Sequence, residues 1–380
     1  MVANSARGLD CQYDRAQHLS TDQHSTFSEH PQVLESYTRS DRHIQELSLM
    51  HRWTTTTYDT IPTKYADDNS IWETEMPEVA LQHPFLLNAL LSITTFELSG
   101  PPETAAADYV KAAMDYRDLA VHDLPDLSST TTAETNAALV YLEPLILLMI
   151  LVSVQHQPST TSLFDILQLL TRYLTLMQSI HSHLNTSSAT LAHHPLHQAT
   201  VTQTDIPSQM LDVLTSTTFR NLDDMNKSRP EPPDEAPFKV RFTATLHQAS
   251  CKKALFWLEE AFTHLPCHSQ DTHDFNGRRF LEHCLGWVQL IDGEYIAALR
   301  EGDQVAILLF LTWTVLVQTH GHRFWWARNL ATKLFQAISG TIDEGTAPVL
   351  HEIFSWARRQ LHQVQQAHVE PHANFPMPAQ

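Results

Sequence analysis

The sequence predicts an all-α protein, and two observations favour this class. The chain has 380 residues but only 9 glycines, few for a fold that needs a glycine-rich turn at every hairpin. Long segments rich in Leu, Ala and Gln show helical spacing. Hydrophobic residues make up 42% of the chain, which is enough for a sizeable core. We therefore expect one helical domain, either a multi-helix bundle or a stacked helical array.

The two ends of the chain differ in character from its middle. Residues 1–43 are polar and rich in His, Ser, Thr and Gln, without sustained apolar periodicity. Such a segment cannot bury enough surface to offset the entropy of ordering the chain. We predict a disordered linker over residues 1–43, a helical domain over residues 44–367 and a disordered tail over residues 368–380.

Two helices are marked by clear signals in the first half. Residues 101–103, Pro-Pro-Glu, place proline and an acidic residue at the favourable end of an Ala-rich stretch, which predicts a helix over Glu103–His122. Apolar side chains then recur at steps of three and four from Leu163 to Met177. This second helix should pack its apolar face inward.

Two apolar runs are predicted to be buried core helices rather than membrane spans. The first, residues 137–154, is interrupted by Glu143 and Pro144, and the second, residues 305–317, is short. A spanning helix needs about 20 apolar residues, so no membrane span is expected. We expect Glu143 to face water or cap a neighbouring turn; a buried acid with a raised pKa is the alternative.

Two low-complexity segments are predicted to be exposed loops. One lies near residues 185–208 and is rich in Thr, Ser and His; the other lies near residues 226–237 and contains four prolines, which block a helix. We do not expect either loop to separate domains, because each half alone would leave long apolar faces uncovered.

The last part of the chain is predicted to form a series of helices. Their predicted bounds are Phe238–His264, Asp274–Leu299, Asp303–His320, Arg323–Ile338 and Ala347–Gln366. No repeat of fixed period is visible, so the choice between array and bundle stays open.

The charge of the chain argues against direct binding of nucleic acid. The chain has 24 Lys and Arg against 43 Asp and Glu, a formal charge of −19. This field repels a polyanion such as DNA. The basic residues occur as small pairs, and not as a stripe, at residues 252–253, 278–279 and 358–359.

Cysteine usage is typical of a reducing compartment inside the cell. Cys11, Cys251, Cys267 and Cys284 are sparse and form no Cys-x-x-Cys pair. The first residues lack the apolar core of a signal peptide. Neither a disulfide framework nor secretion is expected.

Neither a metal centre nor a catalytic motif stands out. The 24 histidines come closest together at residues 181 and 183, 193 and 194, and 320 and 322, none with the spacing of a zinc site. No nucleophile elbow, phosphate-binding loop or dinucleotide fingerprint is present. We do not predict an enzyme, and an uncharacterised enzyme remains a third alternative.

Three segments carry a family resemblance. Residues 46–53 precede Thr57 and Tyr58, residues 71–98 contain the run HPFLLNALLS, and residues 303–309 precede Phe-Trp-Trp. In this order they resemble the regulatory domain of fungal zinc-cluster transcription factors, in particular the sterol uptake control branch. The resemblance spans roughly residues 44–360 and implies an all-α regulatory domain.

Cys11 fits the same resemblance. The segment Arg7–Tyr13 is similar to the end of the family's binuclear zinc cluster, which uses six cysteines to bind two zinc ions; a chance match is the alternative. One cysteine cannot form that cluster. We therefore expect no metal or cofactor in this chain alone, and zinc only if an upstream segment supplies the other cysteines.

The resemblance also implies an apolar ligand pocket, as expected for a domain that senses a sterol or another lipophilic molecule. Motif position suggests six lining residues, although the aromatic residues alone favour ordinary core packing. The predicted ligand-binding residues are Trp72, Phe85, Leu86, Trp313, Trp325 and Trp326.

The predicted function is transcription regulation, of sterol or secondary-metabolite genes, through a lipophilic ligand. The predicted location is the nucleus, with shuttling to the cytoplasm. The alternative is a co-regulator or protein-interaction module that lacks its own DNA-binding end. Such a protein would pair with a zinc-cluster transcription factor or with a second copy of itself.

Overall fold

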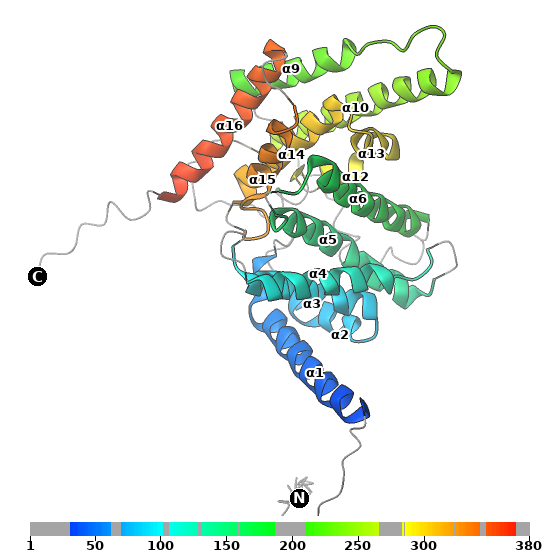
Figure 1. Ribbon diagram of the computed structural model, residues 1–380, viewed down its shortest axis with the longest axis vertical. Coiled ribbons are helices and arrows are strands. Elements are labelled where there is room, and N and C mark those ends of the chain that lie inside the picture. Colours follow the sequence, from blue (N-terminus) through cyan, green and yellow to red (C-terminus); the bar gives the residue numbers. More distant parts are fainter. Residues whose placement is uncertain are drawn as a thin grey trace, which may run out of the picture. The chain divides into compact units, whose positions relative to one another are not determined.

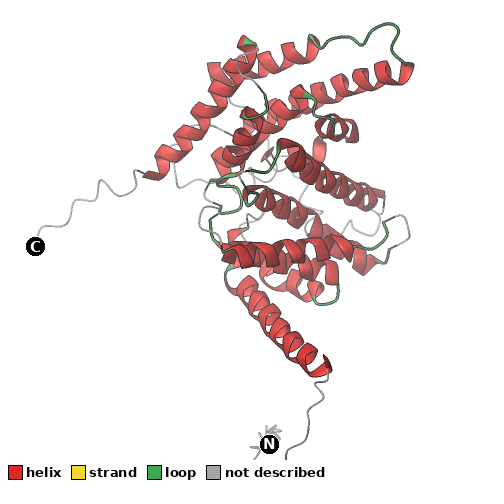
Figure 2. Cartoon of the chain, viewed as in Figure 1, coloured by secondary structure: helices red, strands yellow, loops and turns green. Residues whose placement is uncertain are grey.

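The computed structural model describes most of the chain between residues 31 and 369. Within that range it does not describe residues 62–69, 102–105, 128–130, 159, 187–209, 266–282, 285, 323 and 343–346. Every described element is a helix and none is a strand, which confirms the predicted all-α class (Figures 1 and 2). Cys11, Cys267 and the pair His193–His194 lie outside the described residues, as does nearly all of the predicted tail.

The chain divides into two compact units, a small one of residues 1–45 and a large one of residues 46–380. Helix α1 covers Pro31–Thr55 and so begins inside the segment predicted to be a linker. Its described side chains from Arg42 to Leu47 are mostly exposed, with Leu47 71% exposed. The part of α1 before residue 44 has no sustained apolar periodicity in its sequence, which is why it was predicted to be a linker.

The first half of the larger unit contains short helical turns followed by long helices. Their bounds are η1 Thr57–Thr60, η2 Ile71–Glu75, α2 Met76–Ala80, α3 Pro84–Ser99, α4 Ala107–His122, α5 Ala133–Gln155 and α6 Leu163–Thr186. Among these, α3 packs against α4 and α5, and α5 packs against α6. The second half contains α9 Val213–Lys227, α10 Phe238–His264, α12 Trp287–Leu290, α13 Gly293–Arg300, α14 Gln304–Gly321, α15 Leu330–Ser339 and α16 Pro348–Val369.

Helix α3 begins and ends where its sequence signals lie. Pro84 occupies the first turn, where its missing N–H costs nothing, and Gly100 follows the helix with φ 80°, which suits glycine. Glu103, where the next helix was predicted to start, lies outside the described residues. Ala106 is extended and donates its N–H to Ser99 O at 3.2 Å, so α4 begins at Ala107.

Helix α5 runs without a break through Glu143 and Pro144, the two residues that interrupt its apolar run. The helices around α5 stabilise it, and Figure 1 shows it between α3 and α6. Both α5 and α14 are long and apolar enough to cross a membrane by length and composition. However, 89% and 83% of their apolar windows are buried inside the protein, as in core helices.

The second half corrects two predicted helices. In place of one helix over Asp274–Leu299, the described part contains α12 and α13, with extended Ile291 and the N-cap Asp292 between them. In place of a helix from Arg323, residues 324–329 form turns and α15 begins at Leu330. Helix α10 has the predicted bounds, and the four prolines lie in the loop at residues 228–237 between α9 and α10.

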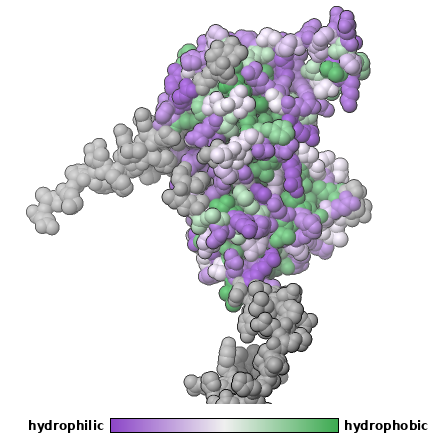
Figure 3. Space-filling view, in the orientation of Figure 1, coloured by the Kyte–Doolittle hydropathy of each residue, from purple (hydrophilic) through white to green (hydrophobic). Residues whose placement is uncertain are grey.

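Buried apolar side chains from Trp53 to Leu361 form one continuous cluster in the larger unit. Helices α5 and α14 contribute most of their residues to it, which fits helices that are apolar all round. The visible outer face carries many hydrophilic residues between smaller apolar areas (Figure 3). The aromatic residues predicted to bind a ligand belong to this cluster or pack against it.

Candidate functional site

The residues predicted to bind a ligand are mostly packed inside the protein. Trp72, Phe85, Leu86, Trp313 and Trp326 are each at most 5% exposed, and Trp325 is partly buried. The hydrogen bonds of the indole N–H groups show what holds this region, because a buried N–H needs an acceptor.

Trp72 lies in η2 against Trp53 from the end of α1. Trp53 donates its Nε1–H to the Trp72 backbone oxygen at 2.8 Å. Phe85 follows in the first turn of α3, where its ring centroid lies 5.5 Å from that of His83. This part of the predicted site therefore joins the end of α1 to η2.

Trp325 and Trp326 lie in the turn between α14 and α15 and bind η1. Trp325 donates to Thr60 Oγ1 at 3.0 Å, and Trp326 donates to the Thr60 backbone oxygen at 3.2 Å. Gln155, at the end of α5, donates to the Trp326 backbone oxygen and accepts the Asn329 backbone N–H at 2.9 Å. These bonds hold the turn in place and explain why it is not helical.

Trp313 belongs to a different aromatic group on α14. It donates to the Cys284 backbone oxygen at 2.7 Å and stacks on Trp287 at a centroid distance of 5.5 Å. Trp287 in turn donates to the Ala254 backbone oxygen at 2.9 Å. We call these three groups, around Trp72, Trp313 and Trp325–Trp326, the aromatic clusters. A ligand role for the six residues stays a prediction.

A pocket of about 390 Å³ lies between α5, α6 and the α12–α13 segment, and none of the six predicted residues lines it. We call it the polar pocket. Its lining residues are Glu143, Met177, Gln178, His181, Ser182, Asn185, Thr186, Gln289, Ile291 and Asp292. Its volume falls in the usual range for small-molecule sites.

Glu143 connects the three elements around this pocket. It is 8% exposed, so the expectation that it would face water is wrong. Its Oε1 atom accepts hydrogen bonds from His181 Nδ1 at 3.0 Å and from Gln289 Nε2 at 3.1 Å. The surrounding helices bury this carboxylate, and two donors from distant parts of the chain offset the free-energy cost of burying it.

Two further side chains fix the α12–α13 segment. Gln178 on α6 donates to the Ile291 backbone oxygen at 2.6 Å. Asp292 accepts the Tyr295 backbone N–H at 3.0 Å, as an N-cap of α13, and lies 3.7 Å from Lys253 Nζ. The pocket therefore has an ordered wall on the side of α13.

The Glu143 carboxylate raises the pKa of His181 above its ordinary value, chiefly through their hydrogen bond and against the opposing effect of burial. His183 is bound elsewhere, to Asn136 Oδ1 at 3.1 Å and Thr131 Oγ1 at 2.9 Å. In the described part of the chain, no three His, Cys, Asp or Glu side chains are placed to hold a metal ion.

The two described cysteines are free, buried thiols on α10 and just before α12. Burial raises the pKa of Cys251 to about 12 and raises the pKa of Cys284 as well. A thiol with so high a pKa is a poor nucleophile at neutral pH. Nothing in this chemistry resembles a catalytic centre among the described residues.

Sequence reasoning missed the polar pocket, although α6 carries a signal for it. Polar residues follow one another at positions 178, 181, 182 and 185, at helical spacing beside the apolar stripe. Gln289 and Asp292 gave no such signal, because one long helix was predicted over them.

Comparison with known proteins identifies the family. A model described as the fungal specific transcription factor domain matches residues 48–256, more than half of the chain. The chain belongs to the fungal specific transcription factor domain family. This confirms the resemblance seen in the sequence, and membership of this family implies a transcription regulator.

One curated relative is sterol uptake control protein 2 of Candida albicans. The two sequences are 33% identical over 61 residues, which is 16% of this chain and 9% of that protein. The match thus spans a small part of the relative.

Within the polar pocket, Glu143 and the α6 residues lie inside the family match, whereas Gln289, Ile291 and Asp292 lie beyond it.

Proposed function

We propose that this chain is the regulatory domain of a transcription regulator that controls sterol or secondary-metabolite genes in response to a lipophilic ligand. The observation that carries transcription regulation is the family match over residues 48–256. The short similarity to a sterol uptake control protein supports the sterol branch. Family membership implies nuclear location, and we propose that the protein shuttles to the cytoplasm.

In this proposal the ligand acts by population shift. It binds one arrangement of the helices better than another, and its differential affinity moves the equilibrium. The weakest part of the aromatic clusters is Trp325, which is partly buried and held by a side-chain hydroxyl of Thr60. An apolar ligand would enter there and separate η1 from the turn before α15.

Thermal unfolding in the presence of ergosterol tests this proposal. A ligand that binds the folded state at about 100 times its Kd adds about 2.7 kcal/mol of stability. We expect ergosterol to raise Tm and Trp325→Leu to reduce that rise. Trp257→Leu is the matched control, because Trp257 is also partly buried but lies on α10. An unchanged Tm across a panel of sterols and fatty acids contradicts the ligand.

A second candidate function is supported by exposed apolar side chains on α10. Phe238, Val240 and Phe242 are 75%, 51% and 51% exposed, and the two phenylalanine rings stack at 5.7 Å. A co-regulator could use these residues to bind a zinc-cluster transcription factor or a second copy of the chain. Loss of such a complex with Phe242→Ser, but not with Lys252→Ser on the same helix, would support this function.

Regulation of genes is tested separately from ligand binding. Deleting the gene in its host should change the expression of sterol or secondary-metabolite genes. Sequencing of the transcripts measures that change. DNA binding is expected only from a longer chain that supplies the remaining cysteines of a zinc cluster, because this chain carries a net charge of −19. Tight, salt-sensitive DNA binding by the present chain would contradict that expectation.

A further inference from the structure

The polar pocket contains more hydrogen-bond acceptors than donors. Within the described part of the chain, both hydrogen bonds to Glu143 end on Oε1, so its Oε2 remains as an acceptor. Gln289 and Gln178 use their amide N–H₂ groups to bind Glu143 and the Ile291 backbone oxygen. Their amide oxygens therefore also remain as acceptors.

The charges of the lining side chains, like the free acceptor oxygens, favour a ligand that donates hydrogen bonds. Glu143 and Asp292 contribute two carboxylates, whereas His181 is the one side chain among the described lining residues that can carry a positive charge. Lys253 lies 3.7 Å from Asp292 but is 53% exposed in its side chain, so solvent weakens this pair. The carboxylates among the lining side chains outnumber the positive charge in either protonation state of His181.

We propose that the polar pocket binds a small organic ammonium ion, whose N–H groups donate hydrogen bonds to Glu143 and Asp292. An ammonium group supplies three N–H donors and a positive charge. The free acceptor oxygens of the pocket can accept its hydrogen bonds, and the carboxylates can balance its charge. Met177 and Ile291 add apolar surface for a short hydrocarbon chain. The volume of about 390 Å³ is large enough for such a molecule.

This inference goes beyond the proposed function and does not depend on it. The pocket shares no residue with the six positions proposed for the lipophilic ligand. Three of its residues come from the segment after residue 256, outside the family match. A ligand here would join α5 and α6 to the α12–α13 segment and stabilise their present arrangement.

The probe for this site is n-butylammonium, measured by ligand-observed NMR and calorimetry on the full chain. Its matched controls are n-butyltrimethylammonium, with the same charge but no N–H donor, and n-butanol, which has no charge. We expect saturable binding of n-butylammonium and about tenfold weaker binding of both controls, because charge-assisted hydrogen bonds need both properties. Equal binding of either control, or no saturable binding, overturns the proposal.

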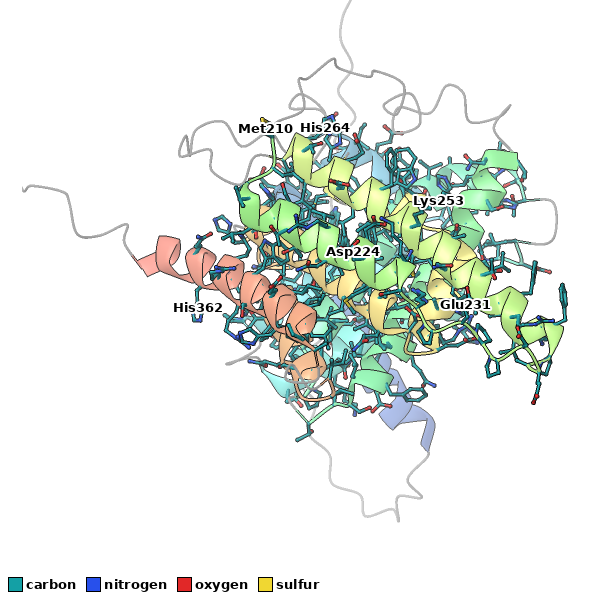
Figure 4. The ribbon with its side chains drawn as sticks, turned by 90° about the horizontal axis from the view of Figure 1, so that it is seen from above. Met210, Asp224, Glu231, Lys253, His264 and His362 are labelled. Atoms are coloured by element: carbon teal, nitrogen blue, oxygen red, sulfur yellow. The ribbon has the colours of Figure 1, made fainter. Side chains whose placement is uncertain are left out.

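Variants test whether the binding is in the pocket. Glu143→Gln keeps the shape and an acceptor for His181, and Asp292→Asn keeps the N-cap of α13. Each should weaken n-butylammonium binding by about tenfold. Asp224→Asn is the control, because it removes one exposed charge from α9, which supplies no lining residue; Figure 4 shows Asp224 and Lys253 on the neighbouring helices α9 and α10.

The test compares the affinity of each variant for n-butylammonium with that of the wild type. An equal loss of binding with Asp224→Asn would assign the effect to the overall negative charge and overturn the proposal. If Glu143→Gln disrupts the fold, as circular dichroism would show, Asp292→Asn decides the matter. Unchanged binding by a folded Asp292→Asn variant then counts against the site.

Discussion

The aromatic clusters and the polar pocket use hydrogen bonds in opposite ways. The indoles of Trp53, Trp287 and Trp313 are buried, and each N–H is bound to a backbone oxygen of the protein. In the polar pocket, Glu143 and two glutamine side chains bind each other or the backbone but keep acceptor oxygens. The difference teaches that these buried tryptophans have their hydrogen bonds completed by the protein itself, whereas the side chains that line the polar pocket keep free acceptor oxygens.

The largest expected loss of stability follows from a substitution in the aromatic clusters. Trp313→Ala removes a fully buried indole, its stacking on Trp287 and its bond to Cys284. We expect a loss of about 3–5 kcal/mol in the free energy of unfolding, measured in urea. Trp257→Ala is the control, since that indole is only partly buried. If both variants lose the same free energy, the aromatic clusters are not the main support of the fold.

His320 should make the packed region sensitive to acid. Its Nε2 atom is buried and has no hydrogen-bond partner among the described residues, and burial, with a smaller effect of His322, lowers its pKa to about 4. The unfolded chain binds the proton first, so stability should fall as pH drops from about 6.5 to about 4, by up to about 3 kcal/mol.

Urea unfolding over this pH range measures that loss. His320→Phe should flatten the pH dependence, whereas His362→Phe should not, because His362 is exposed. An unchanged slope in the His320→Phe variant would mean that other groups cause the acid sensitivity.

Replacing one glutamine beside the aromatic clusters and one beside the polar pocket compares how much each region contributes to the free energy of unfolding. Gln155→Leu leaves the Trp326 backbone oxygen and the Asn329 N–H without this partner in a buried place. We expect a cost of about 2 kcal/mol in the free energy of unfolding. Gln178→Leu breaks one bond, to Ile291, beside the open pocket, and should cost less. The reverse order would mean that the pocket wall is the more rigid part.

The smallest expected effect on stability is the pH-dependent contribution of His181. Its pKa is raised in the folded state, so its contribution to stability is fully present below its unfolded pKa and is lost as pH rises through the folded value. The side chain is 40% exposed, and we expect only about 0.5 kcal/mol. His181→Gln should therefore lose stability relative to wild type below about pH 6.5 and converge with it at higher pH, the opposite of His320. A parallel offset at all pH values would rule out titration of His181.

Much of the fold was predictable because helix formation depends on local signals. The apolar runs predicted α5 and α14 as core helices, and α10 has the predicted bounds. The errors lie where distant contacts override local pattern. The turn before α15 is held by bonds from Trp325 and Trp326 to Thr60, far away in the sequence.

The candidate site was less predictable than the fold. The acceptor Glu143 was visible in the sequence, but its partners His181 and Gln289 lie 38 and 146 residues further along the chain. The break between α12 and α13, which brings Asp292 to the pocket, depends on the bond from Gln178 as well as on the local N-cap. No periodicity encodes such a pairing.

The sequence by itself determined the all-α class, most of the core helices and the family of this protein. These follow from properties of short segments, namely apolar periodicity, helix signals and ordered motifs. Only the tertiary structure decided that Trp53, Trp287 and Trp313 donate to backbone oxygens, that Glu143 is buried, and that α5, α6 and the α12–α13 segment enclose a pocket. The physical reason is that a buried polar group takes its partner from whichever element packs beside it, and packing is a property of the whole chain.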